Sequence, residues 1–106
     1  MSYVDITDEL SRLEAYEEQC GLRFDAISAW YDATDGDITV KGEVHSLDGN
    51  PLSGGRINLV IYDDRDRVVG ISYAFISPEV GFQVFEVSCS PPVNLRPNKI
   101  RLYPEP

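Results

Sequence analysis

From residue 38 to residue 103 the chain alternates apolar and polar residues in short runs separated by glycine, proline and aspartate. A period of two places the apolar side chains on one face of an extended strand, and the separating residues are those that favour turns. Six or seven such runs at short intervals are typical of an antiparallel sandwich rather than of alternating strands and helices. The sequence therefore predicts an all-β sandwich.

The expected strands differ in how their two faces are covered. Residues 38–45 alternate strictly, as in a strand with one buried face. Residues 56–62 are apolar in both phases, which indicates a central strand whose outer face is partly covered. In residues 22–31 the apolar phase slips midway, which predicts a β-bulge. Trp30, in this last strand, is expected in the core.

Three further features are expected towards the C-terminus. Residues 68–76 form a strand in which four apolar side chains share one phase: Val69, Ile71, Tyr73 and Phe75. In residues 81–89 the apolar phase changes, which predicts a bulge near Val84–Phe85. A closing strand is expected near residues 99–103, followed by a frayed Pro104-Glu105-Pro106 end, because proline lacks the N–H that a strand donates.

The N-terminal residues 7–20 have the spacing of a short amphipathic helix that ends at Gly21. Its apolar stripe includes Leu10 and Leu13. Because so short a helix is marginal alone, the stripe must pack against something. Either it covers an edge or open end of the sandwich, or it docks onto a partner or a second copy of the chain.

Size and charge limit the classes of function. The 106 residues suffice for one domain, residues 1–106, with a helix over about 7–20 and a sandwich over about 22–103. The net charge of −9 disfavours nucleic acid, whose binding needs cations that neutralise phosphates. No run approaches the roughly 20 apolar residues that span a bilayer, so membrane insertion is not expected. If Met1 is the natural start, the protein is expected in the cytoplasm, because no signal peptide precedes the domain.

Aspartates crowd two of the expected turns. If the strands run up and down in order, both turns lie at one end of the sandwich and bring together six carboxylates: Asp32, Asp35, Asp37, Asp63, Asp64 and Asp66. Calcium takes six to eight oxygen ligands from such flexible loops. Aspartate is also favoured in turns because its side chain accepts hydrogen bonds from nearby backbone. We expect turn chemistry here, with a calcium site as the alternative.

No catalytic signature is present, so we expect no enzyme activity and no cofactor. His45 is the only histidine, and it lies on the polar phase of its strand. One histidine with the two distant cysteines Cys20 and Cys89 does not form a zinc site. Both cysteines are expected to be buried or half-buried thiols.

Four apolar residues are candidate partner contacts. Leu10 and Leu13 are on the expected helix, and Val60 and Tyr62 are on the outer phase of the central strand. This second pair is expected either beneath the helix or exposed as a contact patch.

Several segments resemble the FxLYD-type prokaryotic immunoglobulin-like domains. The likeness is carried by Val40–Val44, Leu59–Asp63, Val68–Gly70 and Gly81–Val87. In that family a strand that ends in aromatic-aspartate turns into a strand that begins with paired valines. Leu59 and Ile61 stand where the family has phenylalanine and leucine. The resemblance implies an immunoglobulin- or fibronectin-III-like antiparallel sandwich and does not extend to the N-terminal helix. Together with the residue pattern, it leads us to expect six or seven strands and a short N-terminal helix.

A second likeness overlaps the first. Gly42–Val44, Gly49–Leu52 and Gly54–Ile57 are similar to the opening of carboxypeptidase regulatory-like, transthyretin-type sandwiches. Members of both families serve as accessory, adhesion-like or interaction domains. We therefore expect a non-catalytic binding or assembly module that engages another protein by edge-strand addition or through an apolar patch, and that is able to form a homo-oligomer. The alternative is a calcium-dependent adhesion or carbohydrate-binding module.

Overall fold

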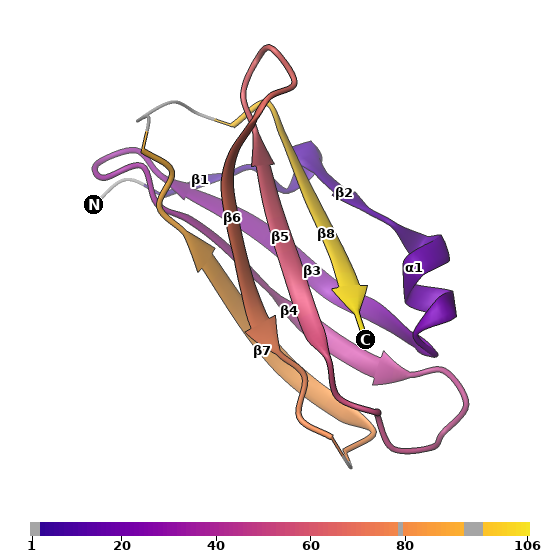
Figure 1. The fold of residues 1–106 in the computed structure, drawn as a ribbon. Helices are drawn as coiled ribbons and strands as arrows, with labels where there is room; N and C mark the ends of the chain where they lie inside the picture. Colours follow the sequence, from indigo (N-terminus) through magenta and orange to yellow (C-terminus); the bar gives the residue numbers. More distant parts are fainter. Residues whose placement is uncertain (1–2, 79, 93–96) are drawn as a thin grey trace.

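The computed structural model describes residues 3–78, 80–92 and 97–106, and it shows two four-stranded sheets packed face to face (Figure 1). The elements, in chain order, are β1 (Tyr3–Asp5), a 3-10 turn (Thr7–Glu9), β2 (Leu10–Arg12), α1 (Glu14–Gln19), β3 (Leu22–Asp32), β4 (Ile38–Ser46), β5 (Arg56–Tyr62), β6 (Val68–Phe75), β7 (Phe82–Cys89) and β8 (Lys99–Glu105).

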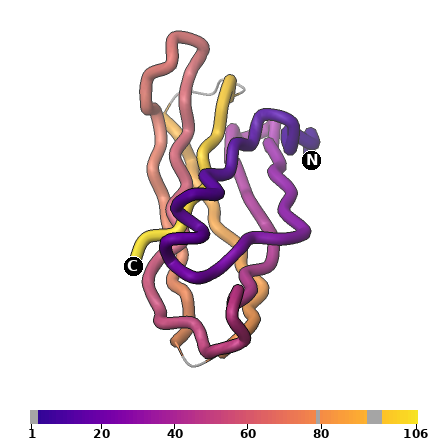
Figure 2. Tube along the Cα trace, turned by 90° about the vertical axis from the view of Figure 1, so that its right-hand side faces the viewer, coloured from indigo at the N-terminus to yellow at the C-terminus, as the bar shows by residue number. Residues whose placement is uncertain are grey.

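One sheet has the order β1-β3-β4-β7 and the other the order β2-β8-β5-β6. This architecture confirms the predicted all-β sandwich with a short N-terminal helix. The described residues form eight strands rather than six or seven, because the N-terminal segment adds β1 to one sheet and β2 to the other. In the side view of Figure 2 this indigo segment passes from one layer to the other. The β2–β8 pair is parallel, so the sandwich is not wholly antiparallel.

The prediction of one helix over residues 7–20 is wrong in its first half. Leu10–Arg12 is extended and pairs with Ile100–Leu102, and the helix covers Glu14–Gln19 alone. A short helix gains little stability by itself, whereas β8 offers a row of backbone hydrogen-bonding groups. Ile6, fully buried, fixes the chain in place because its N–H donates to the Ala29 carbonyl oxygen at 2.8 Å. Gly21, at φ +71°, ends the helical segment as predicted.

The predicted bulge in β3 is confirmed. The register with β4 shifts between Asp25 and Ser28, and Ala26 has φ +51°. The shift moves Ala29 and Tyr31 into the core and Trp30 onto the outer face, so the prediction of a core Trp30 is wrong. Beyond a bulge the inward-facing and outward-facing positions of a strand are exchanged. The sequence does not show at which residue this exchange occurs.

Gly42 lies where the bulge meets the core between the sheets. A Cβ atom at this position would lie 2.6 Å from Ile27 Cγ2 and 3.1 Å from Phe85 Cζ. The Phe85 ring in turn packs on Phe24, with ring centroids 5.5 Å apart. The glycine therefore makes room for the side chain that the bulge turns inward.

We expect Gly42→Ala to lower the free energy of unfolding by about 1–3 kcal/mol, because overpacking forces neighbouring side chains off their rotamers. Urea denaturation followed by circular dichroism measures the change. Gly81→Ala is the matched control, since its added methyl group would meet nothing within 4 Å. Equal midpoints for the two variants would show that Ile27 yields without cost.

Two predictions about the C-terminal strands are wrong. β7 pairs with β4 in an unbroken register, so the expected bulge at Val84–Phe85 is not formed. Strict alternation instead leaves Phe82 and Val84 on the outer face. β8 continues through Pro104 to Glu105, although a frayed end was expected there. Pro104 is tolerated because β2 ends opposite Leu102, so beyond that point β8 has a strand neighbour on one side only.

Candidate binding surfaces

β6, at the edge of its sheet, carries a row of apolar side chains that point away from the core. We refer to four of these residues as the β6 stripe: Val68, Ile71, Tyr73 and Phe75. Their side chains are 51%, 71%, 50% and 67% exposed, in that order. The inward positions of β6 hold the small residues Gly70, Ser72 and Ala74. The Tyr73 and Phe75 rings contact each other edge to face, with centroids 5.3 Å apart.

The sequence of β6 does nothing to block pairing at its free edge. Residues 68–75 contain neither a charged residue nor a proline. Native sandwiches usually protect edge strands with lysine, proline, bulges or a covering loop, because an unpaired strand edge accepts other chains. The one irregularity in β6 lies at its start, where the register with β5 shifts between Ile61 and Tyr62. Beyond this shift the register is regular, and at the C-terminal end of β6 the Phe75 carbonyl oxygen accepts a hydrogen bond from Gln83 Nε2 of β7 at 3.1 Å. The part of the edge between these two points is regular.

β7, the edge strand of the opposite sheet, lies beside β6 and has apolar residues on its own outer face. Phe82 is 48% exposed and Val84 is 68% exposed. The Phe82 ring packs against His45 at a centroid distance of 4.9 Å. The side of the sandwich that β6 and β7 close is therefore flanked by exposed apolar side chains on both faces.

The four predicted partner contacts lie in different surroundings. Leu10 packs against the core as a strand residue. Leu13, Val60 and Tyr62 line one groove between α1 and the outer face of β5 and β8. Val60 is buried in the floor of the groove, and Tyr62 is half-buried. Val60 and Tyr62 are thus neither covered by α1 nor exposed on a flat surface. They face α1 across the groove.

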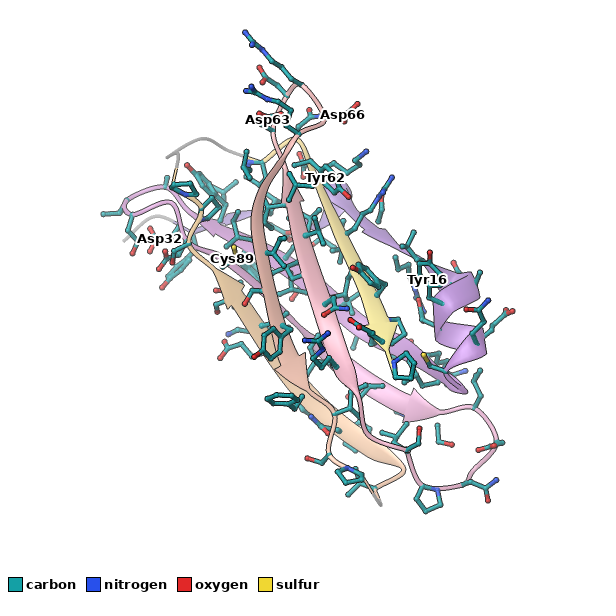
Figure 3. The ribbon with its side chains drawn as sticks, viewed as in Figure 1. Tyr16, Asp32, Tyr62, Asp63, Asp66 and Cys89 are labelled. Atoms are coloured by element: carbon teal, nitrogen blue, oxygen red, sulfur yellow. The ribbon has the colours of Figure 1, made fainter. Side chains whose placement is uncertain are left out.

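The six aspartates of the predicted calcium site are not brought together. Both hairpin turns lie towards the same end of the sandwich, but Figure 3 shows Asp32 and Asp63 on separate projections. Within the residues that the structure describes, no three acidic, histidine or cysteine side chains converge as a metal site requires. Asp32 Oδ1 accepts a hydrogen bond from the Thr34 N–H at 2.9 Å, and Asp35 Oδ1 accepts one from the Asp37 N–H at 3.0 Å. These two aspartates therefore serve as turn acceptors.

Asp63 organises the β5–β6 turn in the same way. Its Oδ1 accepts hydrogen bonds from the backbone N–H groups of Arg67 and Arg65, at 3.0 and 2.8 Å, and its Oδ2 pairs with Arg67 Nε at 2.8 Å. The backbone hydrogen bond from Arg67 is the largest cause that holds the pKa of Asp63 below its ordinary 3.8. In the same turn Asp66 Oδ1 lies 3.5 Å from Lys99 Nζ. The Asp64 side chain is exposed.

We expect Asp63→Asn to destabilise the fold at neutral pH and to flatten its response to acid. A carboxylate whose pKa is lowered by folding contributes stability above its unfolded-state pKa, and this contribution is lost as pH falls between about 5 and 2. Melting temperatures measured across that range provide the test. Asp64→Asn should leave the whole curve unchanged. Superimposable curves for Asp63→Asn and the parent protein would contradict this role of the carboxylate.

His45, on β4, and Cys89, on β7, lie at opposite ends of the β4–β7 pair. Cys89 pairs with Ile38 and His45 pairs with Phe82, so seven strand residues, roughly 23 Å, separate the two side chains. His45 Nε2 lies 3.1 Å from Glu43 Oε1, and both residues lie on the outward-facing, polar phase of β4. Cys20 is half-buried and Cys89 is buried, and both are free thiols as expected. Burial raises the pKa of each thiol.

The outer face of the β1-β3-β4-β7 sheet has a shallow hollow of about 350 Å³. Tyr3 and Trp30 line it together with Thr39 and with the Lys41–Glu86 pair, whose charged atoms lie 3.7 Å apart. Of its two aromatic side chains, Tyr3 is 59% exposed and Trp30 is half-buried.

None of the helices in the described ranges is long and apolar enough to cross a membrane. Comparison with known proteins finds no family model that matches this chain, and no curated protein or solved structure that matches it.

Proposed function

We propose that this protein is a non-catalytic binding module that accepts an extended segment of a partner protein along the free edge of β6. The observation that carries the proposal is the β6 stripe, four large apolar side chains at least half exposed on an edge strand without charge or proline. Soluble proteins rarely leave such a surface uncovered unless it binds something.

Strand addition would use both the free backbone edge of β6 and its outward-facing apolar side chains. Backbone N–H and C=O groups at the free edge supply affinity, and the outward side chains select the residues of the incoming strand. The incoming strand would extend the β2-β8-β5-β6 sheet and place its own apolar residues beside Ile71 and Tyr73. The net charge of −9 favours segments with basic flanking residues.

A displayed library of random eight-residue peptides tests this proposal. We expect the selected peptides to alternate apolar and polar residues and to lose binding to Ile71→Lys, because a charge on the stripe opposes burial. Ile71 is 71% exposed, so the substitution should leave the fold intact. Leu47→Lys is the matched control, since Leu47 is 49% exposed in a loop.

Sedimentation equilibrium across a concentration series tests whether a second copy of the chain occupies the β6 edge. A monomer–dimer equilibrium that Ile71→Lys abolishes would assign the β6 edge to self-association. Selected peptides that bind the parent protein and Ile71→Lys with equal affinity would overturn strand addition at β6.

A further inference from the structure

The groove beside α1 has the size and lining of a small-molecule site. Its volume is about 420 Å³, within the roughly 300–1,000 Å³ range of ligand pockets. It lies on the outer face of the β2-β8-β5-β6 sheet, with α1 as one wall. Its lining includes Leu13, Tyr16, Val60, Tyr62, Arg101 and Tyr103.

Aromatic rings form much of the groove surface. The Tyr16 ring on α1 and the Tyr103 ring on β8 are tilted towards each other, with centroids 5.7 Å apart. Figure 3 shows Tyr62 near the start of β8 and Tyr16 beside α1, farther along the same strand. Val60 provides an apolar floor, which is 8% exposed. A flat apolar or aromatic group would therefore meet aromatic and aliphatic surface inside the groove.

Arg101 places an uncompensated positive charge in this groove. Its guanidinium lies 5.1 Å from the centroid of the Tyr62 ring, and its Nη1 donates to the Tyr62 hydroxyl at 3.2 Å. Within residues 3–78, 80–92 and 97–106, Arg101 forms no ion pair, although the chain carries 18 acidic residues against nine basic ones. A single neutral hydroxyl leaves most of the five guanidinium donors available.

The acidic side chains near the groove do not neutralise Arg101. Glu105 lines the groove, but its Oε2 accepts from Asn58 Nδ2 at 2.7 Å and pairs with Arg56 Nη2 at 2.9 Å. These contacts, that with Asn58 first, lower the pKa of Glu105 and keep it ionised. Glu14 lines a neighbouring depression with Arg101 without forming an ion pair. The guanidinium is left for a ligand, and its planar fork matches a carboxylate.

We propose that this groove binds an aromatic carboxylate, with the ring against Tyr16, Tyr103 and Val60 and the carboxylate on Arg101. The complementary charge distinguishes this ligand class from neutral aromatic compounds of the same shape. The groove adjoins the β6 stripe, because Val60 pairs with Ile71 and Tyr62 pairs with Val68. The ligand would lie over β5 and β8, whereas strand addition uses the free backbone edge of β6, so signal shifts in α1 and β8 distinguish the two proposals.

Titration of the ¹⁵N-labelled protein with naphthylacetate and with naphthylacetamide tests the proposal, because the two probes differ in charge and not in the ring. We expect naphthylacetate to shift the amide signals of α1 and β8 with a Kd of millimolar order or tighter and to bind about tenfold more tightly than the amide. Arg101→Gln should weaken binding of the acid to the level of the amide and leave binding of the amide unchanged.

Two further variants separate the contributions of ring and charge. Tyr16→Ala should weaken both probes, since it removes part of the wall that contacts the ring. Lys41→Gln, which removes an exposed cation on the opposite sheet, should change neither. Equal affinity of the two probes for the parent protein, shifts confined to other surfaces, or no shifts at about 10 mM probe would overturn the proposal.

Discussion

Glu17→Ala is expected to lower the free energy of unfolding by about 3 kcal/mol, because it removes one partner of a buried ion pair. The Glu17 side chain is 2% exposed within α1. It accepts from Arg12 Nη2 at 2.6 Å, from Arg12 Nε at 3.1 Å and from the Phe24 N–H at 2.8 Å. Arg12 Nη2 also donates to the Phe24 carbonyl oxygen at 2.7 Å. The pair thus ties β2, α1 and β3 together.

Chemical denaturation of Glu17→Ala measures the contribution of this ion pair to the free energy of unfolding. Glu18→Ala, a substitution in the same helix, is the matched control. Glu18 is exposed, so its replacement should change the midpoint little. Glu17→Gln should fall between the two, because the amide oxygen still accepts hydrogen bonds and the charge is lost. Equal midpoints for the alanine variants would show that Arg12, which is 32% exposed, is satisfied by water once Glu17 is removed.

The strands that alternate regularly were predictable, and the N-terminal segment was not. β4 lies where its strict alternation predicts, because one buried face requires a period of two. β5 lies where a run that is apolar in both phases predicts a central strand, and it is central in its sheet. Leu10 and Leu13 have a helical spacing, yet Leu10 belongs to a strand and Leu13 precedes α1. The pairing that decides between these outcomes involves β8, about ninety residues away, and local spacing carries no information about it.

The binding surfaces were also only partly predictable. The shared phase of Val69, Ile71, Tyr73 and Phe75 predicts that they lie on one face. This is confirmed for the last three, whereas Val69, beside the register shift, packs against the core. The phase alone does not say which face is exposed. The sequence does hold a hint: Gly70, Ser72 and Ala74 are small, and a Cβ atom at Gly70 would lie 2.7 Å from Cys89 Sγ. Where edge strands of two sheets approach closely, small residues fit inside and large ones turn outward. The sequence alone does not show that β7 lies beside β6, so the small residues do not by themselves identify the buried face of β6.

Gly55→Ala is expected to be among the most destabilising single substitutions, at roughly 3 kcal/mol or more. Gly55 has φ +105°, a backbone conformation that residues with a side chain rarely adopt. An added Cβ atom would also collide with the Glu105 carbonyl oxygen and lie 3.3 Å from Pro106 Cα. Relief of the collision requires the end of β8 to move away from β5, which breaks the pairing of Arg56 with Glu105.

Gly49→Ala separates strain from collision. Gly49 has φ +77° but nothing within 4 Å of an added Cβ atom. Gly49→Ala should therefore lower the free energy of unfolding through backbone strain alone, by about 1–2 kcal/mol. Thermal unfolding of both variants by calorimetry gives the difference. If the two lose the same stability, the end of β8 moves aside without cost. A larger loss for Gly55→Ala would show that Glu105 and Pro106, which line the groove beside α1, are held rigidly by β5.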